Sequence, residues 1–194
     1  MERRTDGGRW TRVRWFVLAT LLLGALLAAC APRSRSVSVP PPATLAAATL
    51  PARPATADTA RMLELVNDAR ARSQRCGSAV LAAAPPLGWD DALALAAERH
   101  ARAMALQGFV GHVSPEGSTV GDRITAAGYR ARAWGENIAA GYVDPAETVA
   151  GFLASPSHCE VLMGSSFEVL GAALVEVEGS VYGSYWTLVF AAPQ

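Results

Sequence analysis

The fold is decided by the stretch VLGAALVEVEGSVYGSYWTLVF, residues 169–190. Two runs rich in β-branched and aromatic residues, 169–177 and 181–190, flank the sequence Glu-Gly-Ser at 178–180. Such runs, separated by a short turn sequence, are typical of two antiparallel strands. The stretch therefore predicts a β-hairpin close to the end of the chain.

Helical patterns precede this hairpin. A helix that starts at Asp90 or Asp91 would end at Gln107, because an aspartate suits the N-cap and Gly108 suits the helix stop. The other predicted helices span residues 59–73, from Ser118 to Gly128, and from Asp144 to about residues 155–156. Because the helices come first and the strands last, the sequence predicts the α+β class.

The first 29 residues have the layout of a secretory signal peptide. Five arginines lie among the first fourteen residues, and an apolar run extends from Trp15 to Ala29. A basic segment, an apolar segment and small residues at the end are the parts of a cleavable signal. The apolar run is shorter than the ~20 residues that a membrane-spanning helix needs. An uncleaved membrane anchor is the alternative interpretation.

The end of this segment, Leu27-Ala28-Ala29-Cys30, resembles the bacterial lipobox. That resemblance implies cleavage before Cys30 and acylation of this cysteine, so that lipid chains anchor the mature protein to a membrane. Ala31, where an aspartate would stand in proteins kept at the inner membrane, favours the outer membrane if there is one. The sequence Ala-Cys-Ala also fits ordinary cleavage, which would release a secreted protein. Both interpretations predict an extracytoplasmic location.

Residues 30–58 predict a tether, and residues 59–194 a single domain. Six of the chain's twelve prolines and no aromatic residue lie between residues 31 and 58. Such a segment buries too little apolar surface to fold and is typical of an extended spacer. The domain has nine arginines, no lysine and 14 acidic residues. Because it lacks the basic stripe that follows a phosphate backbone, its charge argues against binding to nucleic acid.

Two cysteines remain in the domain, Cys76 and Cys159, separated by 83 residues. In an oxidising compartment an isolated pair of cysteines predicts a disulfide bond. The alternative is a reactive thiol at Cys159, next to His158.

Three residues predict a functional site: His112, Glu136 and His158. Each stands in a short block of Gly, Ser, Pro and Asn residues, which places it in a loop at the surface. Imidazole and carboxylate groups bind metals, transfer protons or hold polar ligands. Glu136 has apolar neighbours, so its carboxylate needs a partner. His100 falls on the apolar stripe of its helix and predicts a packed, hydrogen-bonded structural residue.

Seven blocks of the domain together resemble the CAP superfamily of cysteine-rich secretory, antigen 5 and pathogenesis-related-1 proteins, in its bacterial SCP-domain form. The blocks are Cys76-Gly77, Pro86–Asp90, His100–Met104, Gly111–Pro115, Gly135–Ile138, Ser155–His158 and Tyr185–Phe190. The resemblance covers residues 60–193 in the family's order. It implies an α-β-α sandwich with helices on both faces of a small, mainly antiparallel sheet, and further strands near residues 134–140.

The resemblance also joins the three site residues. His112 and Glu136 match the first histidine and one glutamate of the family's central cleft, and His158 matches the second histidine. The family's second glutamate has no counterpart, because Ala154 and Ser155 occupy its place. Members bind divalent metals, sterols or other lipids, and some are described as proteases. His112 and His158, with Glu136 as a further candidate, could supply the ligands of a divalent ion such as zinc.

The sequence therefore supports three hypotheses. The first is a lipid-anchored, extracytoplasmic CAP-domain module that binds a divalent metal and a small apolar or cell-envelope ligand. The second is a metal-assisted hydrolase of peptide or cell-wall material that uses the same residues. The third is a structural envelope protein with a vestigial cleft. If Glu136 is a ligand or orients a histidine, no separate general base is evident, and this argues against the hydrolase.

Overall fold

The computed structural model describes residues 56–194. The predicted signal peptide, the predicted acylation at Cys30 and the tether up to residue 55 lie outside the described residues. In chain order the elements are α1 (Ala57–Arg70), β1 (Gln74–Cys76), β2 (Ala79–Leu81), β3 (Gly88–Trp89), α2 (Asp91–Gln107), α3 (Val120–Ala126), β4 (Ala131–Ala140), α4 (Pro145–Ala154), α5 (Pro156–Leu162), β5 (Val169–Glu176) and β6 (Ser184–Pro193).

The main sheet has the strand order β3-β5-β6-β4. Strands β4, β6 and β5 are antiparallel neighbours, and the two-residue strand β3 is parallel to β5. The predicted strand near residues 134–140 is part of β4, which pairs with β6 over its whole length. The predicted mainly antiparallel sheet is confirmed.

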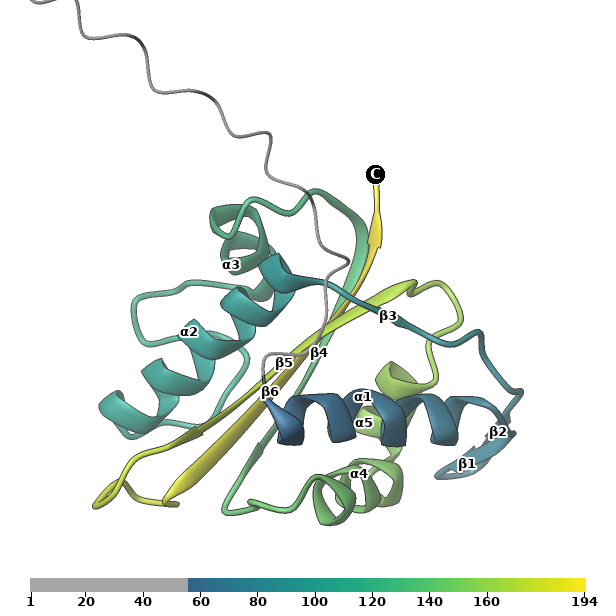
Figure 1. Cartoon of the computed structure of the whole chain (residues 1–194), viewed down its shortest axis with the longest axis horizontal. Coiled ribbons are helices and arrows are strands. Elements are labelled where there is room, and N and C mark those ends of the chain that lie inside the picture. The colour runs from purple at the N-terminus through teal and green to yellow at the C-terminus, as the bar shows by residue number, and fades with distance from the viewer. Residues whose placement is uncertain (1–55) are drawn as a thin grey trace, which may run out of the picture. The chain divides into compact units, whose positions relative to one another are not determined.

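Helices cover both faces of this sheet (Figure 1), with α2 and α3 on one side and α1, α4 and α5 on the other. The central strand β6 is buried on both faces and sends alternate side chains to each. Trp186, Leu188 and Phe190 pack with residues of α1, α4 and α5, whereas Val189 and Ala191 pack with residues of α2 and α3. The predicted α+β class and the α-β-α sandwich are therefore confirmed.

The predicted C-terminal hairpin is present, but its turn is longer than expected. The strands end at Glu176 and resume at Ser184. The amide of Val177 donates to the carbonyl of Gly183, and Gly179 and Gly183 have φ angles of 78° and 76°. Gly179 and Gly183 have the left-handed backbone conformation that closes the loop. Residues 181–183 therefore lie in the turn and do not start the second strand.

The helix starts follow the predicted capping residues. The Asp90 carboxylate accepts from the amide of Leu93 and begins α2, and Gly108, at φ 69°, ends it. Asp144 caps α4 with Pro145 in the first turn. The sequence did not predict α5, in which Pro156 starts a new helix directly after α4 instead of only ending the old one.

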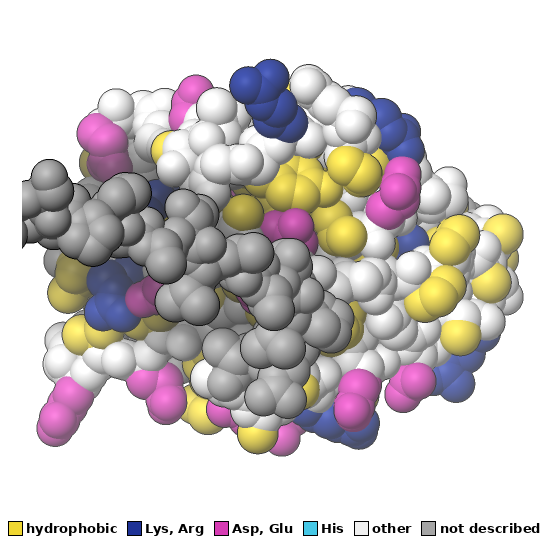
Figure 2. All heavy atoms as spheres, turned by 45° about the horizontal axis from the view of Figure 1, so that its top comes forward, with side chains coloured by type: hydrophobic (Ala, Val, Ile, Leu, Met, Phe, Trp, Pro, Cys, Tyr) yellow, Lys and Arg dark blue, Asp and Glu magenta, His cyan; other side chains and the backbone are white. Residues whose placement is uncertain are grey.

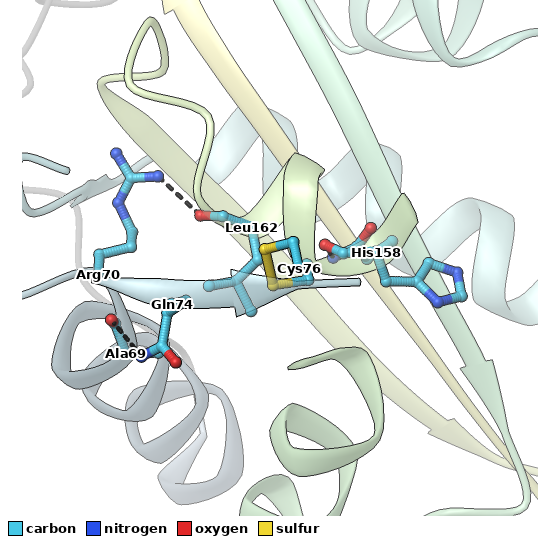
Figure 3. The surroundings of a disulfide bond; sticks show 8 residues. Ala69, Arg70, Gln74, Cys76, His158 and Leu162 are labelled. Carbon is cyan, nitrogen blue, oxygen red and sulfur yellow. Dashed lines mark hydrogen bonds between the residues drawn. A yellow bond between two sulfur atoms is a disulfide. The ribbon is translucent and has the colours of Figure 1, made fainter. Parts of the chain in front are cut away.

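The predicted disulfide bond between Cys76 and Cys159 is present and joins β1 to α5, with 5.3 Å between the Cα atoms. Near it, the buried guanidinium of Arg70 donates to the carbonyl of Leu162 at 2.7 Å (Figure 3). It also donates to the carbonyls of Gly164 (3.0 Å) and Pro85 (2.8 Å). The end of α5 is therefore fixed to α1 and β1. With its sulfur in the disulfide, Cys159 is not the reactive thiol of the alternative interpretation.

The surface of residues 56–194 carries mixed charges. On the face shown in Figure 2, arginine side chains are dispersed among acidic, apolar and neutral polar ones. Within these residues every helix is too short or too polar to cross a bilayer.

Candidate functional site

The carboxylate of Glu136 lies at the centre of the candidate site. The prediction that Glu136 lies in a surface loop is wrong: it is on β4 opposite Val189 of β6, and its side chain is 1% exposed. The next residue along the strand, Asn137, points to the opposite face, where its amide donates to the carbonyl of His158 at 3.0 Å. Because side chains alternate along the strand, Glu136 points toward α2 and α3, whereas Asn137 points toward α5 and contacts it.

Both carboxylate oxygens of Glu136 have partners. Arg123 Nη2 donates to Oε2 at 2.7 Å, and His112 Nδ1 lies 2.9 Å from Oε1. An ionised carboxylate only accepts hydrogen bonds, so Nδ1 of His112 carries a proton. In the neutral imidazole this leaves Nε2 with a free lone pair. The side chain of His112 is 51% exposed, and a ligand can therefore reach it.

Arg123 of α3 is a site residue that the sequence did not reveal. Its side chain is 9% exposed and also donates to the carbonyls of Ser118 (2.9 Å) and His112 (3.1 Å). It therefore connects the loop that carries His112 to the strand that carries Glu136. The need of a buried carboxylate for a partner was visible in the sequence, but nine arginines in the domain could have met it.

His100 of α2 is buried, as predicted, and its Nε2 lies 2.8 Å from the carbonyl of Gly111. The predicted packed, hydrogen-bonded role is confirmed. The same nitrogen lies 3.8 Å from Oε1 of Glu136, so the side chain also borders the site. Burial lowers the pKa of His100, and the opposing effect of the Glu136 charge does not overcome it. At neutral pH the side chain of His100 is therefore uncharged, and it borders the site.

His158 lies in helix α5 and not in the predicted surface loop, because Pro156 starts a helix there. The hydrogen bonds of Glu136 go to Arg123 and His112 and do not include His158. The ring of His158 packs against Phe152 with 5.3 Å between centroids, and it points away from the disulfide (Figure 3). Burial lowers the pKa of His158, and the positive charge of protonated His112 lowers it further. The backbone of His158 is held by the hydrogen bond from the side-chain amide of Asn137 to its carbonyl and by the disulfide of the next residue, Cys159.

The side chains of this site supply only part of the ligand set that a divalent ion needs. Among residues 56–194, no three or more His, Cys, Asp or Glu side chains are grouped so that they could hold a metal ion. Arg123 and His112 each contact one oxygen of Glu136, so this carboxylate orients an imidazole, as outer carboxylates of metal sites do. Two imidazoles, His112 and His158, remain as candidate ligands. Water or a bound ligand would complete the coordination.

Comparisons with known proteins agree with this architecture. The family model for CAP, the cysteine-rich secretory protein family, matches residues 63–190. The structure of an extracellular protein containing an SCP domain from Bacillus anthracis str. Ames has a TM-score of 0.56 and 27% identity, covering 72% of this chain and 45% of that one. An outer surface protein from Borrelia burgdorferi, with a TM-score of 0.54 and 19% identity over 71% of this chain and 96% of its own, shares the fold.

A curated relative, the uncharacterized membrane protein YlbC of Bacillus subtilis (strain 168), is 33% identical over 88 residues. That match covers 45% of this chain and 25% of the relative. The chain thus spans about a quarter of this relative and less than half of the Bacillus anthracis protein. The family match, in contrast, extends from α1 to β6 and includes all the site residues. The chain belongs to the CAP family, the cysteine-rich secretory protein family.

Proposed function

We propose that this chain is an extracytoplasmic binding module whose cleft takes up a divalent metal ion through His112 and His158, together with a small apolar or cell-envelope ligand. The observation that carries the proposal is the hydrogen bond between His112 Nδ1 and buried Glu136. It fixes the imidazole in one orientation and leaves Nε2 as a lone-pair donor at a half-exposed position.

The second imidazole supports the same proposal. Burial keeps His158 neutral at neutral pH, and a metal ion binds the neutral form of histidine. Two protein ligands leave several positions of the ion open, and there an oxygen of a bound ligand could be polarised. Val110 and Val113, which flank His112 in sequence, are 45% and 54% exposed. These apolar side chains suit a ligand with an apolar part.

The extracytoplasmic location has separate support. One similar structure is described as extracellular and another as an outer surface protein. A disulfide bond persists in an oxidising compartment, which the cytoplasm of most organisms is not. The proposal includes a lipid anchor at Cys30, joined to the domain by the tether, so that a membrane surface is the partner of the mature protein.

Calorimetric titration of the mature chain with Zn²⁺ tests the metal site. We expect saturable binding that is lost in His112→Ala and in His158→Ala, and that is weakened about 10- to 100-fold in Glu136→Gln, which disturbs the orientation of His112. Glu116→Gln is the matched control, because Glu116 is an exposed carboxylate on the same loop as His112. Undiminished binding in the two histidine variants would exclude this site.

The His112–Glu136 pair also favours a second candidate, a hydrolase. A histidine whose Nδ1 is held by a carboxylate is the arrangement of many general bases. Assays with peptide and cell-wall substrates separate the two functions. If the wild type turns over one of these substrates and His112→Ala does not, the chain is a hydrolase. If there is neither turnover nor binding of metal, the cleft is vestigial.

A further inference from the structure

A second groove lies beside α3, separate from the histidine site. It has a volume of about 700 Å³ and lies between α3, the start of β4 and the final residue Gln194. Gly121 and Asp122 line it, whereas Arg123 of the same helix contacts Glu136. His112, Glu136 and His158 are not among its lining residues. We call it the α3 groove.

One wall of the α3 groove is an exposed indole. Trp134 is 50% exposed, whereas the other tryptophans of residues 56–194, Trp89 and Trp186, are 9% and 0% exposed. The indole is supported by the backbone of α3, because a Cβ atom at Gly121 would come within 3.2 Å of its Cζ2 atom. A side chain at position 121 would therefore displace the ring. The structure thus places a large aromatic side chain at the surface, packed against α3.

Polar groups around this indole are available to a ligand. Within residues 56–194, no hydrogen bond engages the hydroxyl of Tyr129, the guanidinium of Arg130 or the indole N–H of Trp134. Asp122 uses one carboxylate oxygen to cap α3, and the Gln194 amide adds both a donor and an acceptor. The groove therefore offers donors and acceptors around an apolar platform.

We propose that the α3 groove binds an oligosaccharide chain, with one sugar ring stacked on Trp134. A sugar ring has an apolar face of C–H groups, which the negative face of an aromatic ring attracts. Its hydroxyl groups both donate and accept, as do the groups that surround Trp134. This site is independent of the metal proposed at His112 and His158.

Other ligand classes fit the groove less well. A nucleic acid needs several phosphate-binding cations, and Arg130 is the only cationic side chain among the lining residues of the groove. The carboxylate of Asp122, also among the lining residues, offsets this charge. A lipid chain needs an apolar enclosure, whereas Thr119, Asp122, Arg130 and Gln194 line this groove. A neutral polar chain with apolar ring faces matches both properties.

NMR titration of the mature chain with β-1,4-linked trisaccharides of N-acetylglucosamine and of glucose tests the proposal. We expect at least one trisaccharide to shift the indole N–H signal of Trp134 saturably at up to about 10 mM, the range of weak ligands. Backbone amide signals of the groove residues report binding in the variants that lack this indole. Trp134→Ala should weaken binding about tenfold or more, and Trp134→Phe should retain most of it. Tyr129→Phe, which removes one hydroxyl and keeps the packing, should weaken it about threefold to tenfold.

Two controls separate this site from others. Tyr182→Ala removes an aromatic side chain that is 52% exposed and lies outside the groove, so binding should not change. His112→Ala should also leave it unchanged, whether or not the histidine site binds a metal. The proposal is overturned if no trisaccharide shifts the Trp134 signal, if Trp134→Ala binds as tightly as the wild type, or if only fatty acids or detergents bind.

Discussion

At the scale of single residues, the site depends on how one buried carboxylate is neutralised. Glu136 is 1% exposed, and its charge is balanced by Arg123 at 2.7 Å and by the N–H of His112 at 2.9 Å. Burial of an ionised carboxylate without such partners is strongly unfavourable. The contacts of Glu136 that orient His112 therefore also stabilise the fold around the site.

Removal of Arg123 should destabilise the domain severely. Arg123→Gln leaves the Glu136 carboxylate buried without its cation, and we expect the free energy of unfolding to fall by about 3–5 kcal/mol. The double variant Arg123→Gln/Glu136→Gln should recover part of this loss, because no charge is then buried alone. Denaturation with urea measures both effects. The control is Arg132→Gln, which breaks an exposed pair with Glu168 and should change stability by about 0–1 kcal/mol. An equally small change in Arg123→Gln would contradict the burial argument.

His100 should make the stability depend on pH. Its folded pKa is below the ordinary value of about 6.5, mainly because of burial, so the unfolded chain binds more protons just below that pH. The stability contributed by the neutral ring is therefore complete above about pH 6.5 and declines as the pH falls below it. Urea denaturation at about pH 7 and pH 5.5 should show this decline, and His100→Gln should show less of it. An identical decline in both proteins would rule out His100 as a source.

The sequence was sufficient to single out the chemical groups of the site, but not their pairing. His112 and Glu136 stood out because their chemically active side chains are flanked by Gly, Ser, Pro and Asn residues, although Glu136 proves to lie in β4. The contact between them, and the position of Arg123, depend on how α3 packs on β4. No local pattern encodes this contact, because the residues come from three segments that only the tertiary fold brings together.

At the scale of elements, the long helices and the hairpin could be predicted, and the short elements could not. Capping residues and periodicity located α2 and α4, and β-branched runs located β5 and β6. The three strands β1, β2 and β3 have two or three residues each, too few to show a period. They form through tertiary pairing: β3 pairs with β5 of the main sheet, and β1 and β2 pair with each other next to the disulfide.

The contact between α2 and β5 depends on Gly171. A Cβ atom at this position would collide with the backbone of Leu93 and Ala94 at the start of α2. We expect Gly171→Ala to lower the free energy of unfolding by about 1–3 kcal/mol, because backbone cannot move aside as a side chain can. Gly88→Ala is the matched control in the neighbouring strand, since its nearest new contact would be an ordinary 3.7 Å to Val169. Thermal unfolding compares the two, and equal melting temperatures would refute the close contact.

At the scale of the whole molecule, the described domain is one part of a longer chain with a distinct N-terminal composition. Residues 1–29 and 30–58 predict a lipoprotein signal and a tether, and both predictions stand on the sequence alone. The domain that follows is recognisable because seven blocks occur in the family's order, and the family match extends over residues 63–190.

Mass spectrometry of the mature protein from a bacterial host tests the anchor. We expect a chain that begins at Cys30 and carries the mass of its acyl chains, because more than one chain gives stable anchoring to a membrane. Cys30→Ser should prevent acylation and move the protein from the membrane fraction to the soluble fraction. An unmodified N-terminus at Pro32 in the wild type would show that the protein is secreted and not anchored to a membrane.

The protonation of His112 and its response to a metal test the proposed function most directly. Long-range ¹H–¹⁵N NMR spectra of the imidazoles, recorded near neutral pH with and without Zn²⁺, distinguish the two ring nitrogens. We expect Nδ1 of His112 to carry the proton throughout, and Zn²⁺ to shift Nε2 of His112 and one ring nitrogen of His158 together. A proton on Nε2 of neutral His112, or spectra of both histidines that Zn²⁺ leaves unchanged, would contradict the proposed metal-binding cleft.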